Sequence, residues 1–129
     1  MAEGGRLTWL RRLHDQRRLW AALAAVGALV IALGSLTPGS EMPDNLPWDK
    51  ANHFVGYAGL AGLIGLAGVR LPLAFLAAVL FGIAIEYAQI PVPGRSGGDW
   101  ADILANTLGA AFAVLLLRLV RRLLERVPS

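Results

Sequence analysis

An uncharged run of 18 residues, Leu19 to Leu36, is the feature that most narrows what this chain can fold into. As an α-helix the run is about 27 Å long, close to the thickness of the hydrocarbon core of a membrane. The apolar part of a cleaved signal peptide is shorter, about 7–15 residues, and no clear Ala-x-Ala cleavage site follows this run. The run therefore predicts a retained transmembrane helix.

Three further apolar segments are predicted to be helices: residues 49–69, 71–90, and 100–117 or beyond. The three prolines between Thr37 and Pro47 exclude a helix there, and Pro91 and Pro93 end the third apolar segment. In the polar segment before Leu19, a helix is expected only near residues 11–18. The pattern predicts an all-α membrane protein with a bundle of four transmembrane helices.

The composition agrees with a membrane protein of one domain. Of the 129 residues, 56% are hydrophobic and only 16% are charged, which is little charge for a soluble domain of this size. Cys is absent, so the sequence excludes disulfides and thiol chemistry. The basic residues flank the apolar segments, which indicates contacts with lipid headgroups rather than with nucleic acid.

The distribution of Lys and Arg predicts the topology. With four spans and both termini cytoplasmic, only Lys50 and Arg95 of the 12 basic residues lie outside. The inner residues are Arg6, Arg11, Arg12, Arg17, Arg18, Arg70, Arg118, Arg121, Arg122 and Arg126. The predicted organisation is a basic cytoplasmic segment (1–18), a membrane domain (19–119) and a basic cytoplasmic tail (120–129). The expected location is the bacterial plasma membrane.

This topology brings the polar residues of separate segments to the outer membrane face. They are Glu41, Asp44, Asp49, Lys50, Asn52, His53, Glu86, Gln89, Arg95, Asp99, Asp102 and Asn106. Glu86 is the most informative of them, because fifteen uncharged residues precede it and an ionisable group inside a membrane helix is costly unless it is paired or protonated.

Helical spacing predicts which faces are packed against protein. Two stripes combine small and polar residues: Ala74, Ala78, Gly82 and Glu86, and Asp102, Asn106, Gly109 and Ala113. Glycine recurs at every third position from Gly56 to Gly68, and we expect this glycine stripe to be a packing surface. Asp49, His53 and Tyr57 are one turn apart on the same segment.

Each polar residue also has a structural interpretation, and these alternatives stay open. Asp49 is a natural N-cap, with Trp48 in the membrane interface. Lys50 can extend to headgroups, and Arg95 can be a loop charge. His53, Gln89 and Asn106 can form hydrogen bonds between helices that fix their register.

The polar motifs resemble those of the VanZ-like family of small bacterial membrane proteins. The matching pieces are Asp49-Lys50-x-x-His53-Phe54-x-x-Tyr57, Glu86-x-x-Gln89, and Pro93-Gly94-Arg95 followed by Asp102-x-x-x-Asn106-x-x-Gly109. The resemblance covers residues 19–119 and implies a multi-pass plasma-membrane protein. Asp102 matches the acid of the family by its spacing to Asn106, and Asp99 is the alternative. The family's namesake is linked to reduced susceptibility to the glycopeptide teicoplanin.

The first function we expect is binding or modification of lipid-linked or cell-wall headgroups at an outward-facing polar site. The residues expected to form that site are Asp49, Lys50, His53, Glu86, Gln89, Arg95, Asp102 and Asn106. The expected partners are membrane lipids, a lipid-linked envelope precursor and a second copy of the chain. No cofactor, nucleic acid or resident metal is predicted, since no metal motif occurs.

A membrane enzyme acting on a lipid phosphate or acyl group is the alternative. His53, Glu86 and Asp102 would then be the catalytic candidates, with Arg95 as a phosphate clamp. Within this alternative, a divalent cation would be held by His53, Glu86, Asp99 and Asp102. A purely structural polar network is the third interpretation, and a transporter is less favoured because four helices are few for a transport pathway.

Overall fold

The computed structural model describes residues 2–42 and 49–126, and the regular structure in these residues is entirely helical. Its elements are α1 (Ala2–His14), α2 (Arg17–Ser35), the short 3₁₀ helix η1 (Gly39–Glu41), α3 (Asp49–Leu66), α4 (Leu71–Ala88) and α5 (Trp100–Glu125). The predicted all-α class is confirmed. Asp44 and Trp48 lie outside the described residues, so the predictions for them are not addressed.

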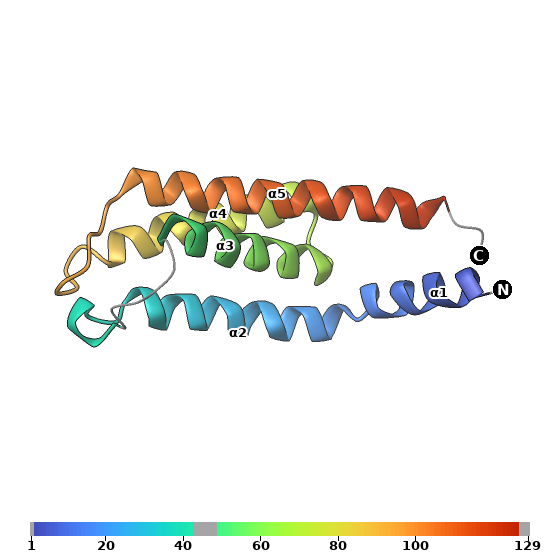
Figure 1. The fold of residues 1–129 in the computed structure, drawn as a ribbon, viewed down its shortest axis with the longest axis horizontal. Helices are drawn as coiled ribbons and strands as arrows, with labels where there is room; N and C mark the ends of the chain where they lie inside the picture. The colour runs from blue at the N-terminus through green and yellow to red at the C-terminus, as the bar shows by residue number, and fades with distance from the viewer. Residues whose placement is uncertain (1, 43–48, 127–129) are drawn as a thin grey trace.

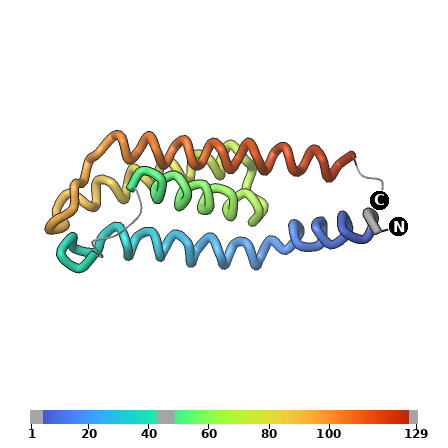
Figure 2. The backbone as a smooth tube through the Cα atoms, viewed as in Figure 1, coloured from blue at the N-terminus to red at the C-terminus, as the bar shows by residue number. Residues whose placement is uncertain are grey.

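The four long helices α2–α5 run along one another as an elongated bundle (Figure 1). The chain reverses direction between successive helices from α2 to α5, while α1 continues the line of α2, so α1 and the end of α5 lie at the same end of the bundle (Figure 2). α3 is central: it packs most extensively against α5 and also contacts α2 and α4. This central position brings the first turn of α3 close to the polar residues of its neighbours.

Small residues allow the helices to pack this closely. Ala74, Ala78 and Gly82 are buried on α4 together with Glu86, as their helical spacing predicts. On α5, a side chain at Gly109 would overlap the backbone carbonyl of Phe54, so α3 and α5 touch backbone to backbone there. Tyr57, Leu60, Ala61, Ala78 and Ala110 form the apolar core beside this crossing.

The predicted glycine stripe on α3 is a packing surface only in part. A Cβ on Gly65 would lie 2.8 Å from Leu117 Cδ2, whereas one on Gly59 would meet no atom within 4 Å. A step of three residues turns an α-helix by about 300°, so glycines at this spacing drift around the helix instead of sharing one face. The tightest α3–α5 contact is therefore made by Gly109 of α5.

Several helix ends differ from the predicted ones. α3 ends at Leu66, before Gly68, whose φ of +101° is typical of glycine in a turn. α4 ends at Ala88 rather than Ile90, and α5 continues to Glu125, through the start of the predicted tail. At the N-terminus, α1 already begins at Ala2 and is followed by a break at Asp15 and Gln16, whereas a helix was expected near residues 11–18.

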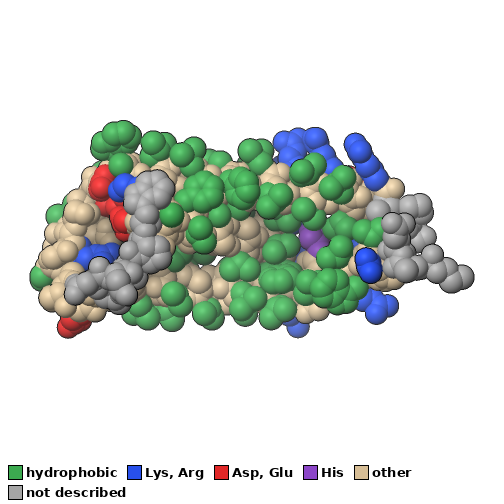
Figure 3. Space-filling model, viewed as in Figure 1, with side chains coloured by type: hydrophobic (Ala, Val, Ile, Leu, Met, Phe, Trp, Pro, Cys, Tyr) green, Lys and Arg blue, Asp and Glu red, His purple; other side chains and the backbone are tan. Residues whose placement is uncertain are grey.

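Three helices, α2, α4 and α5, are long and apolar enough to cross a membrane. α3 has the same length as α4, 18 residues, but its first turn carries charged and polar side chains. Hydrophobic side chains cover the middle of the bundle. Most of the basic residues in view lie toward one end, and the acidic residues lie toward the other, with some Lys and Arg beside them (Figure 3). The chain is thus a helical membrane protein, while four spans and cytoplasmic termini stay predictions.

Candidate functional site

The polar residues gather at the end of the bundle where the loop after α2 meets the loop between α4 and α5. The backbone N–H of Gly39 donates to the carbonyl of Pro93 at 2.8 Å. Gly94 has a φ of +71°, and a side chain at Gly39 would overlap its carbonyl. These two glycines therefore let the loops close over the ends of the helices.

Asp99 precedes the first residue of α5 and caps the helix. Its Oδ1 accepts from the backbone N–H of Ala101 at 2.9 Å, so it is the N-cap of the helix. Its Oδ2 lies 3.3 Å from Lys50 Nζ. The hydrogen bond from Ala101 and then the ammonium of Lys50 hold the pKa of Asp99 below its usual value.

Asp102, one turn further along α5, has a different environment. It is buried, and its Oδ1 accepts a hydrogen bond from Lys50. Its Oδ2 faces His53 Nε2 at 3.7 Å. Of the two candidate acids, Asp102 is thus the one that faces the histidine.

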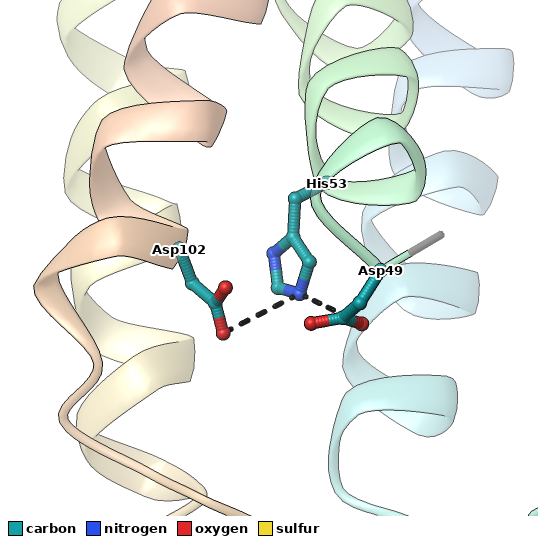
Figure 4. Close-up of side chains that lie close together, drawn as sticks. All are labelled: Asp49, His53 and Asp102. Atoms are coloured by element: carbon teal, nitrogen blue, oxygen red, sulfur yellow. Dashed lines mark ion pairs between the residues drawn. The ribbon is translucent and has the colours of Figure 1, made fainter. Parts of the chain in front are cut away.

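His53 lies between two carboxylates (Figure 4). Its Nε2 is 3.6 Å from Asp49 Oδ1, one turn earlier on α3, and 3.7 Å from Asp102 Oδ2. Its Nδ1 is 3.0 Å from Oδ1 of the buried Asn106. An amide oxygen only accepts hydrogen bonds, so Nδ1 is the donor in this contact, and Nε2 is the ring nitrogen that faces the two carboxylates.

Glu86 and Gln89 secure the neighbouring segments. Glu86 is only 1% exposed, and its Oε1 accepts from the backbone N–H of Asp99 at 2.9 Å. Gln89 is also buried, and its Nε2 donates to the carbonyl of Ser35 at the end of α2, at 2.9 Å. Glu86 thus positions the start of α5, and Gln89 ties α4 to α2.

A small cavity opens between these residues, and we call it the polar chamber. Its volume is about 150 Å³, and it is lined by Asp49, His53, Gln89, Gly94, Arg95, Ser96 and Asp102. Five of the eight predicted site residues line it. Lys50, Glu86 and Asn106 do not. Lys50 and Asn106 contact Asp102 and His53, which do line it, whereas Glu86 holds the backbone of Asp99 at the start of α5.

A larger groove between α2 and α3, the α2–α3 groove, adjoins the polar chamber. Its volume is about 430 Å³, and it is lined by Val30, Ile31, Gly34, Ser35, Met42, Asp49, Asn52, His53, Gly56, Tyr57 and Arg95. The groove and the chamber share Asp49, His53 and Arg95. The two depressions therefore adjoin at these residues, and the chamber is polar whereas the groove is largely apolar.

The comparison with protein families agrees with the motifs at this site. A family model described as VanZ/LLP1 matches residues 7–121, most of the chain. The chain belongs to the VanZ/LLP1 family. The resemblance predicted from the motifs is confirmed, and the match extends beyond residues 19–119 at both ends. No curated protein and no solved structure is significantly similar to the chain.

Tyr57 was part of the VanZ-like motif but was not predicted as a site residue. It is 3% exposed, and its hydroxyl has no hydrogen-bond partner among the described residues. Its ring lies against α4, where a Cβ on Gly82 would be 2.9 Å from Tyr57 Cε1. The four-residue spacing from His53 was the signal that places it one turn below the histidine, beside the groove.

The contribution of α2 to this VanZ/LLP1 site was also missed. Val30, Ile31 and Gly34 line the groove, yet in the sequence they belong to a uniformly apolar run. Nothing in their residue types separates a groove-lining face of α2 from a lipid-facing one. Only the packing of α2 beside α3 reveals it.

Proposed function

We propose that this protein binds the anionic headgroup of a lipid-linked envelope molecule in the polar chamber, with the lipid chain in the α2–α3 groove. The observation that carries the proposal is that the two depressions share Asp49, His53 and Arg95. A single amphiphilic molecule matches such a surface, because its polar and apolar parts are also joined end to end.

Arg95 supplies the charge that a phosphate headgroup requires. It lines both depressions and forms no ion pair with another described residue. Lys50, by contrast, is engaged by Asp99 and Asp102. A guanidinium can form two parallel hydrogen bonds to a phosphate, so Arg95 is the principal headgroup contact in this proposal.

The surface of α2 supports entry of the chain from the membrane. Val30 is 62% exposed, and Leu33 is 63% exposed, so this part of α2 is not covered by other helices. A Cβ on Gly34 would meet no atom within 4 Å, which leaves the groove open at its polar end. A prenyl or acyl chain lying there would replace bilayer lipid without breaking contacts within the protein.

The proposal includes the predicted topology: a multi-pass protein of the bacterial plasma membrane with the polar chamber at the outer face. If each of α2–α5 crosses the membrane, the reversals of direction between them correspond to four passes, and the basic residues concentrate at the end occupied by α1. A basic end facing the cytoplasm follows the usual charge bias of membrane proteins. α3 would then cross with its polar first turn at the outer interface.

Binding of a polyprenyl phosphate to the purified protein, measured by native mass spectrometry, tests this function. Arg95→Ala should reduce binding at least several-fold, and Gly34→Leu should do the same by filling the groove. Arg126→Ala removes a distant, exposed arginine and should bind like the wild type. Equal binding by all four proteins, or equal binding of the uncharged polyprenol, would contradict the proposal.

In cells, the proposal predicts that Arg95→Ala changes glycopeptide susceptibility while the amount of folded protein stays the same. A phenotype that follows only the amount of folded protein would favour the structural polar network instead. That network is visible in the contacts of His53 with Asn106 and of Gln89 with Ser35.

One observation favours chemical modification of the headgroup as a second candidate function. His53 lines the chamber and its Nδ1 is held by Asn106, so Nε2 is the ring nitrogen available as a general base. Incubation of the pure protein with radiolabelled polyprenyl phosphate tests it. Release of phosphate that is lost in His53→Gln would support an enzyme, and an unchanged lipid would exclude this reaction.

A further inference from the structure

The polar chamber presents a difficulty for an anionic ligand. Asp49 and Asp102 line the same small space as Arg95, so their carboxylates would repel a phosphate. Of the two Asp102 oxygens, Lys50 contacts Oδ1, and Lys50 does not line the chamber. A second positive charge between the carboxylates would remove this repulsion.

We infer that Asp49, His53 and Asp102 form a binding site for a divalent cation, with Zn²⁺ as the best match. One ligand atom from each residue lies within 4.8 Å of the other two. Asp49 and His53 come from one turn of α3, and Asp102 comes from α5 (Figure 4). A cation there would join the two helices that form the largest interface of the bundle.

Two of the three separations between ligand atoms are close to those around a tetrahedral ion, and the third is at most 4.8 Å. His53 Nε2 is 3.6 Å from Asp49 Oδ1 and 3.7 Å from Asp102 Oδ2, both too long for hydrogen bonds. Bonds of about 2.1 Å to a tetrahedral Zn²⁺ place ligand atoms about 3.4 Å apart. Octahedral Mg²⁺ brings neighbouring ligands to about 3.0 Å and prefers oxygen alone, so it matches less well.

Asn106 gives independent support, because it orients the histidine from outside the cluster. Histidine ligands of metals commonly donate their second ring N–H to a neighbouring acceptor, which fixes the ring and its tautomer. Here Nδ1 donates to the buried Asn106 at 3.0 Å, which leaves Nε2, the ring nitrogen that faces the two carboxylates, to bind the metal.

The set of ligands differs from the one considered in the sequence. Glu86 Oε1 accepts from the backbone of Asp99, and Asp99 caps α5, so neither carboxylate is placed in this cluster. Asp49 replaces them. Three protein ligands leave the fourth position of Zn²⁺ open toward the chamber, where Arg95 lies, and that position suits a water molecule or a phosphate oxygen.

Zinc binding to the full-length protein in detergent, after treatment with a chelator, tests this inference by titration calorimetry. We expect one Zn²⁺ per chain, with affinity reduced about 10-fold or more in Asp49→Asn, His53→Gln and Asp102→Asn. The matched control is Glu41→Gln, which removes an exposed acid of η1 outside the cluster and should keep full affinity. Because the Asp49 side chain is 68% exposed, Asp49→Asn should fold even if the buried variants do not.

A wild-type protein that binds no Zn²⁺, or an equal affinity in Asp49→Asn and Glu41→Gln, would overturn the cation site. The role of the cation at the headgroup rests on the proposed function, so the same samples are tested for polyprenyl phosphate binding. Zinc binding without lipid binding would support the site and contradict the headgroup function. Lipid binding without zinc binding would contradict the cation site alone.

Discussion

Asp99 and Asp102 are three residues apart on one helix end, yet their surroundings separate them. Asp99 is partly exposed and caps α5, whereas Asp102 is buried against Lys50 and His53. An acid can form a helix cap at the surface without a second partner, but a buried acid needs one. We therefore assign the structural role to Asp99 and the role in the site to Asp102.

Substitutions of Asp99 should separate its two contacts. Asp99→Ala removes the cap and the ion pair with Lys50, and should lower the Tm in detergent more than Asp99→Asn, because Asn is also a good N-cap. The Tm difference between wild type and Asp99→Asn measures how much the negative charge of Asp99 contributes to stability.

The pKa of Asp99 is lowered in the folded protein, so this charge stabilises above the unfolded pKa of about 3.9. The benefit is lost as the pH falls through the still lower folded pKa. The Tm difference between wild type and Asp99→Asn should therefore shrink under acidic conditions. A Tm difference that stays constant down to low pH would contradict a stabilising role for the charge of Asp99.

At the scale of the helices, the close contact between α3 and α5 sets the geometry of the site, because His53 is on α3 and Asp102 is on α5. Gly109→Ala would push a methyl group into the carbonyl of Phe54 and should destabilise the protein by about 1–3 kcal/mol. Gly62→Ala is the matched control in the same interface, since its Cβ would lie at an ordinary 3.8 Å from Ala113. Unfolding in denaturant measures the loss of stability in both variants. An equal loss would contradict a backbone contact between α3 and α5 at Gly109.

The sequence allowed much of this arrangement to be predicted, for a physical reason. Charged side chains such as Lys50 and Asp102 are costly inside a bilayer, so their positions mark the helix ends that must lie together. The stripe from Ala74 to Glu86 likewise follows from helical periodicity and is buried.

Other features depend on contacts between distant segments and leave no local pattern. The meeting of Gly39 with Gly94, and the α2 wall of the groove, are of this kind. The apolar residues of α2 satisfy a lipid contact and a protein contact equally well. Residue type therefore does not distinguish the two.

For the whole molecule, the absence of Cys allows a direct test of orientation. Ser96 is exposed in the loop at the polar chamber, and Glu125 is exposed at the end of α5, at the opposite end of the bundle. In intact cells with a permeable outer layer, a membrane-impermeant maleimide should label Ser96→Cys. It should label Glu125→Cys only after the plasma membrane is opened. Labelling of both from outside, or of Glu125→Cys alone, would contradict the proposed topology.

The central claim is that one lipid occupies the chamber and the groove together. A polyprenyl phosphate with a photoreactive group in its chain, crosslinked to the protein in membranes and mapped by mass spectrometry, tests this claim most directly. We predict crosslinks at Val30, Ile31 and Gly56 that disappear in Arg95→Ala, because the headgroup contact holds the chain in place. Crosslinks spread over exposed residues of α5 such as Leu115, with no effect of Arg95→Ala, would contradict the account.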